Sequence, residues 1–162
     1  MEKEKIRINE VIEKAFEIFN QQLKLRGIEV EKDIDKNLPK IMGDPNRLEQ
    51  VFINLLINAR DAVEEKWQNK AYKPGDKKIV LKAKLKKKSI VVEVGDTGPG
   101  VSDRIADKIF EPFFTTKEVG KGTGLGLSIS YGIIKDCGGR IYVDTRKRDG
   151  ATFIIKFPLP TG

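Results

Sequence analysis

The sequence predicts an α+β domain, a two-layer sandwich in which about three helices cover one face of a mixed, mostly antiparallel sheet. Its length of 162 residues is that of a single domain, assigned here to residues 1–162. Helical and strand-like patterns interleave without the regular strand–helix–strand alternation of a parallel fold, and neighbouring strand segments are spaced as hairpins. Helices gathered on one face of a sheet are the arrangement that this order of elements favours.

The helices are predicted from apolar residues that recur every three or four positions. Gly27 ends the first helix, and Asp44 with Pro45 starts the second as N-cap and first helical residue. Gly138 and Gly139 end the third. The predicted spans are Ile6 to Leu25, Pro45 to about Lys66, and about Gly124 to Asp136.

Five segments have the patterns of strands. In the second of them, apolar side chains alternate with lysines, which predicts one buried and one solvated face, with Val80 as the exception. The alternating apolar residues are Ile79, Leu81, Ala83 and Leu85. The five segments are residues 28–34, 78–85, 89–96, 140–146 and 151–159, of which the second and third form a hairpin.

Composition excludes several classes of protein. The longest stretch without a charge, residues 122–134, is thirteen residues long, too short to cross a bilayer. The charged start MEKEKIRINE is not a signal peptide, and the single cysteine, Cys137, fits a reducing, cytoplasmic location. Residues 73–88 hold eight lysines and one aspartate, and so account for the whole net charge of +7. This run has no interleaved aromatic residue or arginine for stacking, so we expect a solvated face and no nucleic-acid partner.

Two asparagines stand out on the second predicted helix. Asn54 and Asn58 are four residues apart and so lie on one side of it, with Arg47 and Asp61 at similar angles. A carboxamide oxygen can bind a hard cation such as Mg²⁺, which takes its other ligands from water and phosphates. The alternative is ordinary hydrogen bonding at the border of a buried face.

Two glycine-rich segments suggest close approach of the backbone to a ligand. Asp96 ends an apolar strand and is followed by Thr97-Gly98-Pro99-Gly100, where a carboxylate could accept from an exocyclic amine while a flat base lies on the glycines. By itself this segment also fits a simple turn. The second segment, GKGTGLGLS at residues 120–128, precedes an apolar helix, and backbone N–H groups at a helix N-terminus favour a phosphate. Its glycine spacing matches neither the dinucleotide fingerprint nor the Walker A loop.

The loop between these segments contains FEPFFTTK. Its phenylalanines could fill the core or hold a mobile flap over a ligand, in which case Lys117 and Lys121 would supply charge to phosphates. Together, N-x-x-x-N-A, D-T-G-x-G, F-E-P-F-F-T-T-K and G-x-G-T-G-L-G-L resemble the N, G1, F and G2 boxes of sensor histidine kinase catalytic domains. These domains belong to the superfamily of gyrase, Hsp90 and MutL ATPases, and the motifs look most like those of nitrogen-regulator-type kinases.

The resemblance, which covers nearly the whole chain, implies a Bergerat-type ATP-binding fold, ATP and Mg²⁺ as ligands, and a lid over the nucleotide at about residues 103–123. It implies that Asn58 coordinates Mg²⁺, that Asn54 supports the metal or the phosphates, and that Asn54, Asn58 and Lys117 are catalytic. Asp61 stands where many relatives have a lysine, so it remains a nucleotide-site residue without an implied phosphate contact. The remaining implied nucleotide contacts are Asp96, Gly98, Gly100 and Thr152 around adenine and Lys117, Lys121, Gly122, Thr123, Gly124, Leu125 and Gly126 at the phosphates.

Two absences bear on the reaction. Hydrolytic members of the superfamily carry a general-base glutamate one turn before the Mg²⁺ asparagine, where this chain has Asn54, and a neutral carboxamide cannot take a proton from water. The chain also has no histidine. The resemblance therefore implies transfer of the γ-phosphoryl group to a histidine on a separate dimerisation domain that precedes this one in the parent kinase and is absent from these residues.

The implied partners are that dimerisation domain and a response regulator, with the isolated fragment a monomer. The parent kinase could be soluble or membrane-anchored. Three alternatives remain open: a non-catalytic nucleotide-binding regulatory module, a hydrolytic ATPase of the same superfamily, and a serine kinase of the anti-sigma type.

Overall fold

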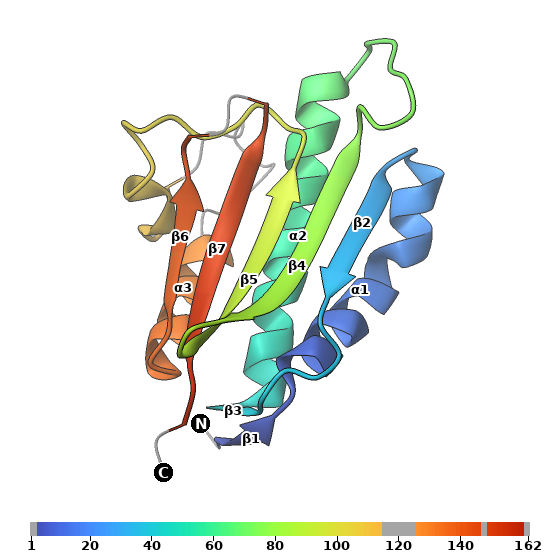
Figure 1. The fold of residues 1–162 in the computed structure, drawn as a ribbon. Coiled ribbons are helices and arrows are strands. Elements are labelled where there is room, and N and C mark those ends of the chain that lie inside the picture. The colour runs from blue at the N-terminus through green and yellow to red at the C-terminus, as the bar shows by residue number, and fades with distance from the viewer. Residues whose placement is uncertain (1–2, 115–125, 147–148, 161–162) are drawn as a thin grey trace.

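A five-stranded sheet with strand order β2-β4-β5-β7-β6 organises the chain (Figure 1). The computed structural model describes residues 3–114, 126–146 and 149–160. Within these residues β2 is parallel to β4, and the remaining neighbours are antiparallel. The strands are β2 (Glu29–Ile34), β4 (Lys78–Lys86), β5 (Ser89–Asp96), β6 (Arg140–Asp144) and β7 (Ala151–Pro158).

The helices lie together on one face of this sheet, as Figure 1 shows. The described residues contain α1 (Ile8–Leu25), α2 (Pro45–Trp67) and α3 (Gly126–Asp136), with a short 3₁₀ turn, η1 (Lys108–Phe110). The predicted α+β class, with helices on one face of a mixed and mostly antiparallel sheet, is confirmed.

The helix signals in the sequence act as expected. Asp44 caps α2, where its carboxylate accepts from the backbone N–H groups of Asn46 and Arg47 at 3.0 and 3.4 Å. Pro45 is the first helical residue of α2. The apolar stripe of α1 is buried against α2 and the sheet, and consists of Ile8, Val11, Ile12, Ala15, Phe16, Phe19 and Leu23.

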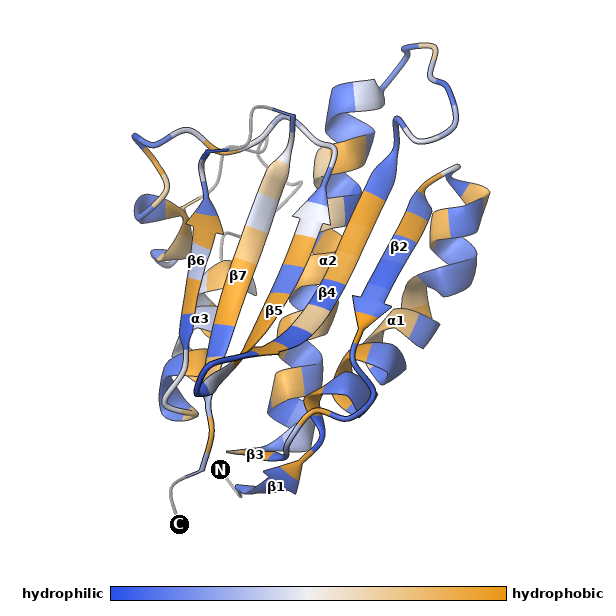
Figure 2. Cartoon of the chain, viewed as in Figure 1, coloured by the Kyte–Doolittle hydropathy of each residue, from blue (hydrophilic) through white to orange (hydrophobic). Residues whose placement is uncertain are grey.

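The β4–β5 hairpin follows the predicted alternation over most of its length. Ile79, Leu81 and Ala83 are at most 2% exposed, so they form the buried face of β4. Leu85 departs from the prediction: it lies near the end of the strand and is 46% exposed. Lysines of β4 face acidic residues of the parallel neighbour, β2, which is largely hydrophilic (Figure 2).

A second, two-stranded sheet was not predicted from the sequence. Residues of β1 (Glu4–Ile6) pair antiparallel with those of β3 (Ile41–Gly43), which closes the lower end of the α1–α2 layer. Three residues are too few to show a period, and the two strands are more than thirty residues apart. The sheet places Ile6 and Ile41 in the core, where they are 7% and 1% exposed.

Candidate functional site

The predicted site lies where β5 ends, β7 begins and α2 passes the sheet. Asp96, the last residue of β5, is opposite Ala151, the first residue of β7. The α2 helix carries the two asparagines, and its C-terminal half packs on the loop that follows Asp96. Three elements that are distant in sequence, α2, β5 and β7, thus supply residues 54, 58, 96 and 152.

Asp96 is a buried carboxylate held by backbone donors. It is 7% exposed, and its Oδ1 accepts from the N–H of Gly98 at 2.8 Å and from that of Ala151 at 3.4 Å. The first bond closes an Asx turn, which an aspartate followed by a flexible residue forms readily. The carboxylate therefore has a fixed direction at the edge of the sheet.

Glycines surround Asp96 because the backbone has no room for side chains there. A Cβ on Gly98 would lie 2.6 Å from Ala62 Cβ and 2.8 Å from the Ala62 carbonyl carbon, so the loop touches the α2 backbone. Gly100 has φ +85°, a left-handed conformation that favours glycine, and a Cβ there would lie 3.0 Å from the Gly150 carbonyl oxygen. These contacts stack the loop between α2 and the start of β7.

Thr152, on the strand next to that of Asp96, supplies a second buried polar group at this end of the sheet. It is 3% exposed, and its Oγ1 has no hydrogen-bond partner among the residues that the structure describes. It is paired with Gly95 in the sheet, and a Cβ on Gly95 would lie only 3.2 Å from that oxygen. A buried hydroxyl without a partner is rare in proteins, so it fits a ligand or a bridging water. The residues present therefore fit the adenine end of a nucleotide.

Asn54 ties α2 to α3. Its Nδ2 donates to the Gly126 carbonyl at 3.2 Å and to Ser130 Oγ at 3.3 Å, while its Oδ1 accepts from Gln50 Nε2 at 2.9 Å. Its carboxamide thus holds the first turn of α3 in place. Asn58 is half-buried one turn further along the same side of α2.

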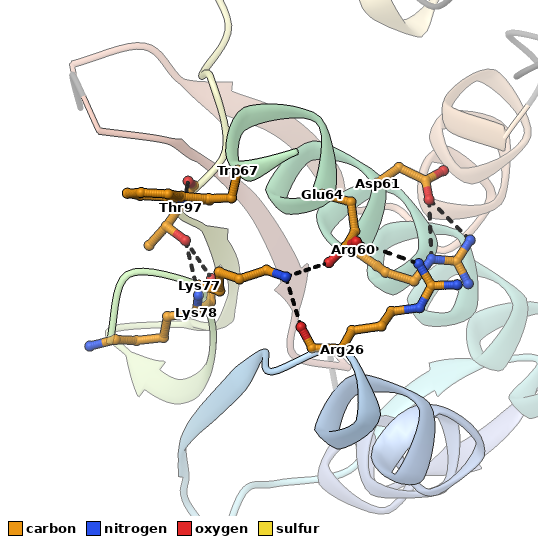
Figure 3. A network of polar contacts seen from close by, with 8 residues as sticks. All are labelled: Arg26, Arg60, Asp61, Glu64, Trp67, Lys77, Lys78 and Thr97. Atoms are coloured by element: carbon orange, nitrogen blue, oxygen red, sulfur yellow. Dashed lines mark hydrogen bonds and ion pairs between the residues drawn. The ribbon is translucent and has the colours of Figure 1, made fainter. Parts of the chain in front are cut away.

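Asp61 lies on the next turn of α2 and pairs with its neighbour in sequence. Arg60 contacts Asp61 Oδ1 through Nε at 3.1 Å and through its terminal nitrogen at 3.0 Å, and also donates to Gln22 of α1 at 2.6 Å. Figure 3 shows this pair beside Arg26 and Glu64. Asp61 is thus part of a polar network between α1 and α2.

Several predicted site residues lie outside the described residues: Lys117, Lys121, Gly122, Thr123, Gly124 and Leu125. So does the part of the predicted lid beyond residue 114. Of the predicted phosphate segment the structure describes Gly126, the first residue of α3.

The three phenylalanines in the described part of the predicted lid differ in burial. Phe110 packs on Tyr131 of α3 and edge-on against Phe153 of β7, with ring centroids 5.7 and 6.2 Å apart. Phe114 lies partly buried against the core, whereas Phe113 is 72% exposed and has φ +66°. Two of the three rings therefore fix the loop to the domain, and the third does not.

Three contributors to the site were missed from sequence. Ser130 is fully buried in α3, and its Oγ accepts a hydrogen bond from Asn54 Nδ2. Gly150 lies directly against the Asp96 backbone and has φ +111°. Trp67, the last residue of α2, donates to the Thr97 carbonyl. A glycine just before the strand that carries Thr152 was a usable signal for Gly150, but the other two depend on contacts over 30 or more residues.

Three further observations concern metal binding, membrane spanning and cavities. In the described residues, no group of three or more cysteine, aspartate or glutamate side chains could enclose a metal ion. No helix among them is long and apolar enough to cross a membrane. A cavity of about 950 Å³ lies between α1 and β2, at the opposite edge of the sheet from α3, and its lining contains none of the predicted site residues.

Known proteins share both the sequence and the fold. The family described as histidine kinase-, DNA gyrase B-, and HSP90-like ATPase matches residues 43–161. Sensor kinase CckA of Brucella abortus (strain 2308) is 45% identical over 139 residues, which cover 82% of this chain and 15% of that protein. Sporulation kinase A of Bacillus subtilis (strain 168) is 35% identical over 156 residues, 96% of this chain and 24% of that protein.

A solved structure matches over almost its whole length. The nucleotide-free catalytic domain of histidine kinase ThkA has a TM-score of 0.81 and 33% identity, and the match covers 98% of this chain and 96% of that one. The chain spans about a sixth to a quarter of the two curated relatives above, so it corresponds to one domain of such proteins.

Proposed function

The chain belongs to the family of histidine kinase-, DNA gyrase B- and HSP90-like ATPases, as the ATP-binding catalytic domain of a histidine kinase, and from this premise we propose that it holds Mg²⁺–ATP and donates the γ-phosphoryl group to a histidine of a separate dimerisation domain. The observation that carries the proposal is the buried Asp96 carboxylate, together with the buried Thr152 hydroxyl of the neighbouring strand, which has no hydrogen-bond partner among the described residues. An acceptor and a hydroxyl of this kind suit the exocyclic amine and ring edge of adenine.

Selectivity for adenine over guanine follows from the same two residues, and mainly from Asp96. Adenine presents an amine to the Asp96 carboxylate, whereas guanine would present a carbonyl oxygen to it. Loss of a hydrogen bond to a charged group costs about 1.5–3 kcal/mol. Calorimetry should therefore show tighter binding of ATP or ADP than of GTP, and equal affinities would contradict the assignment of Asp96.

At the phosphate end, we assign Asn58 as the protein ligand of Mg²⁺. Bound there, the ion would neutralise charge on the phosphate oxygens. Asn54 holds Gly126 and Ser130 of α3, so it positions the helix whose N-terminus follows the glycine-rich segment. Lys117 and Lys121 are proposed phosphate contacts, and we propose that residues 103–123 act as the lid.

Transfer then depends on position and electrostatics. The carboxamide of Asn54 cannot remove a proton from water, so the chain offers no general base at this place. With water left unactivated, the acceptor is the imidazole of the dimerisation domain, which brings its own nucleophile. The reaction that this arrangement favours is phosphoryl transfer and not hydrolysis.

The proposed partners follow from the relatives. A related structure is that of histidine kinase ThkA in complex with response regulator protein TrrA, with a TM-score of 0.76 and 29% identity. We propose that the parent of this chain likewise phosphorylates a response regulator. Because ATP is supplied in the cytoplasm, we place the domain there.

The test is labelling in trans. The purified domain is incubated with γ-labelled ATP, Mg²⁺ and a separately produced histidine-bearing dimerisation domain, and acid-labile label on the second protein is measured. Asn58→Ala should abolish labelling, whereas Asn20→Ala, the same change on the remote helix α1, should leave it intact. Tight ATP binding without labelling of any acceptor would instead indicate a regulatory nucleotide-binding module.

A further inference from the structure

Trp67 ends α2 with a hydrogen bond to the loop that follows Asp96. Its indole Nε1–H donates to the carbonyl oxygen of Thr97 at 3.2 Å. Figure 3 shows the indole of Trp67 against Thr97, at the side of the network that joins α2 to the start of β4. The ring is half-buried and packs on the core, so this donor comes from a fixed direction.

The bonded carbonyl belongs to the same peptide unit that orients Asp96. The Thr97 carbonyl and the Gly98 N–H are the two polar groups of one planar peptide, and the Gly98 N–H donates to Asp96 Oδ1 at 2.8 Å. In a trans peptide these two groups point in opposite directions. A donor that fixes the carbonyl on one side therefore fixes the N–H that meets the carboxylate on the other.

The surrounding contacts leave this peptide dependent on Trp67. The Thr97 N–H donates to the Lys78 carbonyl at 3.1 Å, and Thr97 Oγ1 accepts from the Lys78 N–H at 2.9 Å, so the residue is held on its N-terminal side by β4. These bonds do not involve its carbonyl. Glycine at position 98 has no side chain to hold the peptide, so apart from the close packing of Gly98 on Ala62, rotation of the peptide is resisted by its own two hydrogen bonds.

The end of α2 is itself well held. Lys77, 8% exposed, forms an ion pair with Glu64 Oε1 of α2 at 2.9 Å and donates to the Arg26 carbonyl at the end of α1 at 2.7 Å (Figure 3). Ala62 of α2 lies directly against Gly98. The helix turn that carries Trp67 is therefore a rigid base for the contact.

We infer that Trp67 is a positioning residue for base recognition: its indole N–H sets the Thr97–Gly98 peptide, which holds the Asp96 carboxylate in the direction that selects adenine over guanine. The inference rests on the proposed function, since it assumes that Asp96 faces the base. Its consequence is that selectivity depends on one hydrogen atom of a residue outside the pocket, whereas a packing role would depend on the ring alone.

The chain permits a direct test because it contains a single tryptophan. Expression in a tryptophan auxotroph supplied with β-(3-benzothienyl)alanine replaces only the indole of Trp67, with sulfur in place of the N–H. The matched control is the same protein made with 5-fluorotryptophan, which keeps the N–H. Trp67→Phe provides a second N–H-free form if the first folds poorly, and circular dichroism with thermal melting establishes folding in each.

Two measurements decide the outcome. In the nucleotide-free protein, amide hydrogen exchange at Gly98 should be about three- to tenfold faster without the indole N–H, the range expected from loss of one neutral hydrogen bond. Calorimetric affinity for ADP should fall by a similar factor with little change for GDP, so the selectivity ratio should fall. The fluorotryptophan protein should match the unaltered one in both.

The two ways of failing are distinct. If the fluorotryptophan protein prefers ADP over GDP and the benzothienyl and Trp67→Phe forms keep both that ratio and the Gly98 exchange rate, the positioning role is wrong and the proposed nucleotide site stands. If the unaltered protein shows no preference for ADP, the assignment of Asp96 and hence the proposed function is wrong. Faster exchange at Gly98 with unchanged selectivity also overturns the role of Trp67 in recognition.

Discussion

At the scale of single residues, the site is built from polar atoms whose hydrogen bonding is fixed before any ligand arrives. Asp96 receives two backbone N–H groups, and Asn54 uses both ends of its carboxamide within the protein. Thr152 differs, because its buried Oγ1 finds no partner in the described structure. An unpaired buried polar atom lowers the stability of the free protein, and a ligand that forms a hydrogen bond with it is expected to remove this cost.

Thr152→Val tests this contrast. Valine has the same shape without the hydroxyl, so we expect the nucleotide-free protein to gain stability, by about 1 kcal/mol, as the unpaired group is removed. Binding of ADP should weaken by about the same amount. Chemical denaturation and calorimetry measure the two effects, and a loss of stability together with unchanged ADP affinity would contradict the placing of Thr152 at the base.

Cys137 gives a prediction for pH. Burial raises the pKa of its thiol above the ordinary value. At pH 8 the native thiol should therefore hold less thiolate than a free cysteine, and iodoacetamide should alkylate the native protein more slowly than the urea-unfolded chain. The folded state favours the protonated thiol, so this group's contribution to stability is present below the ordinary pKa and is lost as the pH rises through the higher, folded one.

At the scale of elements, close contact of backbones decides the site. Gly150, the residue before β7, lies against the carbonyl of Asp96 at the end of β5 and has φ +111°. Gly150→Ala should therefore destabilise the domain by about 3 kcal/mol or more, through both steric overlap and backbone strain. Thermal unfolding measures it.

The control for this change is in α3. Gly132 lies within that helix, and a Cβ there would have no atom within 4 Å among those described, so Gly132→Ala should stabilise the protein by about 0.5–1 kcal/mol. Opposite signs at two glycines of one chain are expected. Equal and small effects would show that the loop after β5 moves away from β7 at little cost.

The elements also show where sequence reasoning succeeds. Spans of α1 and α2 and the β4–β5 hairpin were predicted within about two residues, because caps, proline and apolar periods are local signals. The parallel pairing of β2 with β4, the sheet of β1 and β3 and the exposure of Leu85 were not predicted. Each depends on which distant segment packs beside a strand, and the local sequence of one segment does not determine this.

The same division holds within the site. Asp96 and its glycines were found because they are consecutive, whereas Ser130 and Trp67 act across 76 and 30 residues. Neither has a pattern of its own: a serine in an amphipathic helix and a tryptophan at a helix end are common. Their roles emerge only from packing of α3 and of the Asp96 loop on α2.

At the scale of the whole molecule, the lysine-rich stretch is paired with acidic residues of the edge strand. The lysine-rich stretch at residues 73–88 lies around β4, where Lys78 pairs with Glu31 at 3.3 Å and Lys84 with Asp33 and Asp35 at 2.7 and 2.9 Å. Those acidic residues lie on or just after β2, at the edge of the sheet remote from α3. The charge of this lysine-rich stretch is therefore offset in part by ion pairs with the edge strand, while Lys78 at the start of β4 reaches the loop of the candidate site through Thr97.

What the molecule as a whole does with ATP follows from Asn54. The isolated domain should bind ATP and leave it almost intact, since the residue one turn before Asn58, the proposed metal ligand, is a carboxamide and the chain has no histidine to label. Asn54→Glu restores a carboxylate one helical turn from Asn58 and should raise phosphate release, by up to about 10²-fold. Release of labelled phosphate from γ-labelled ATP is the measurement.

The contacts of Asn54 also provide a control for this substitution. Asn54 donates to the Gly126 carbonyl and to Ser130, so either longer side chain disturbs the contact with α3, and only glutamate adds a base. Asn54→Gln has the length of glutamate without its charge, so it should share any loss of stability and show no gain in hydrolysis. If Asn54→Gln and Asn54→Glu release phosphate equally, loosening of α3 and not the carboxylate is responsible. Fast release by the unaltered domain would place the chain among the hydrolytic members of its superfamily and contradict the phosphotransfer proposed above.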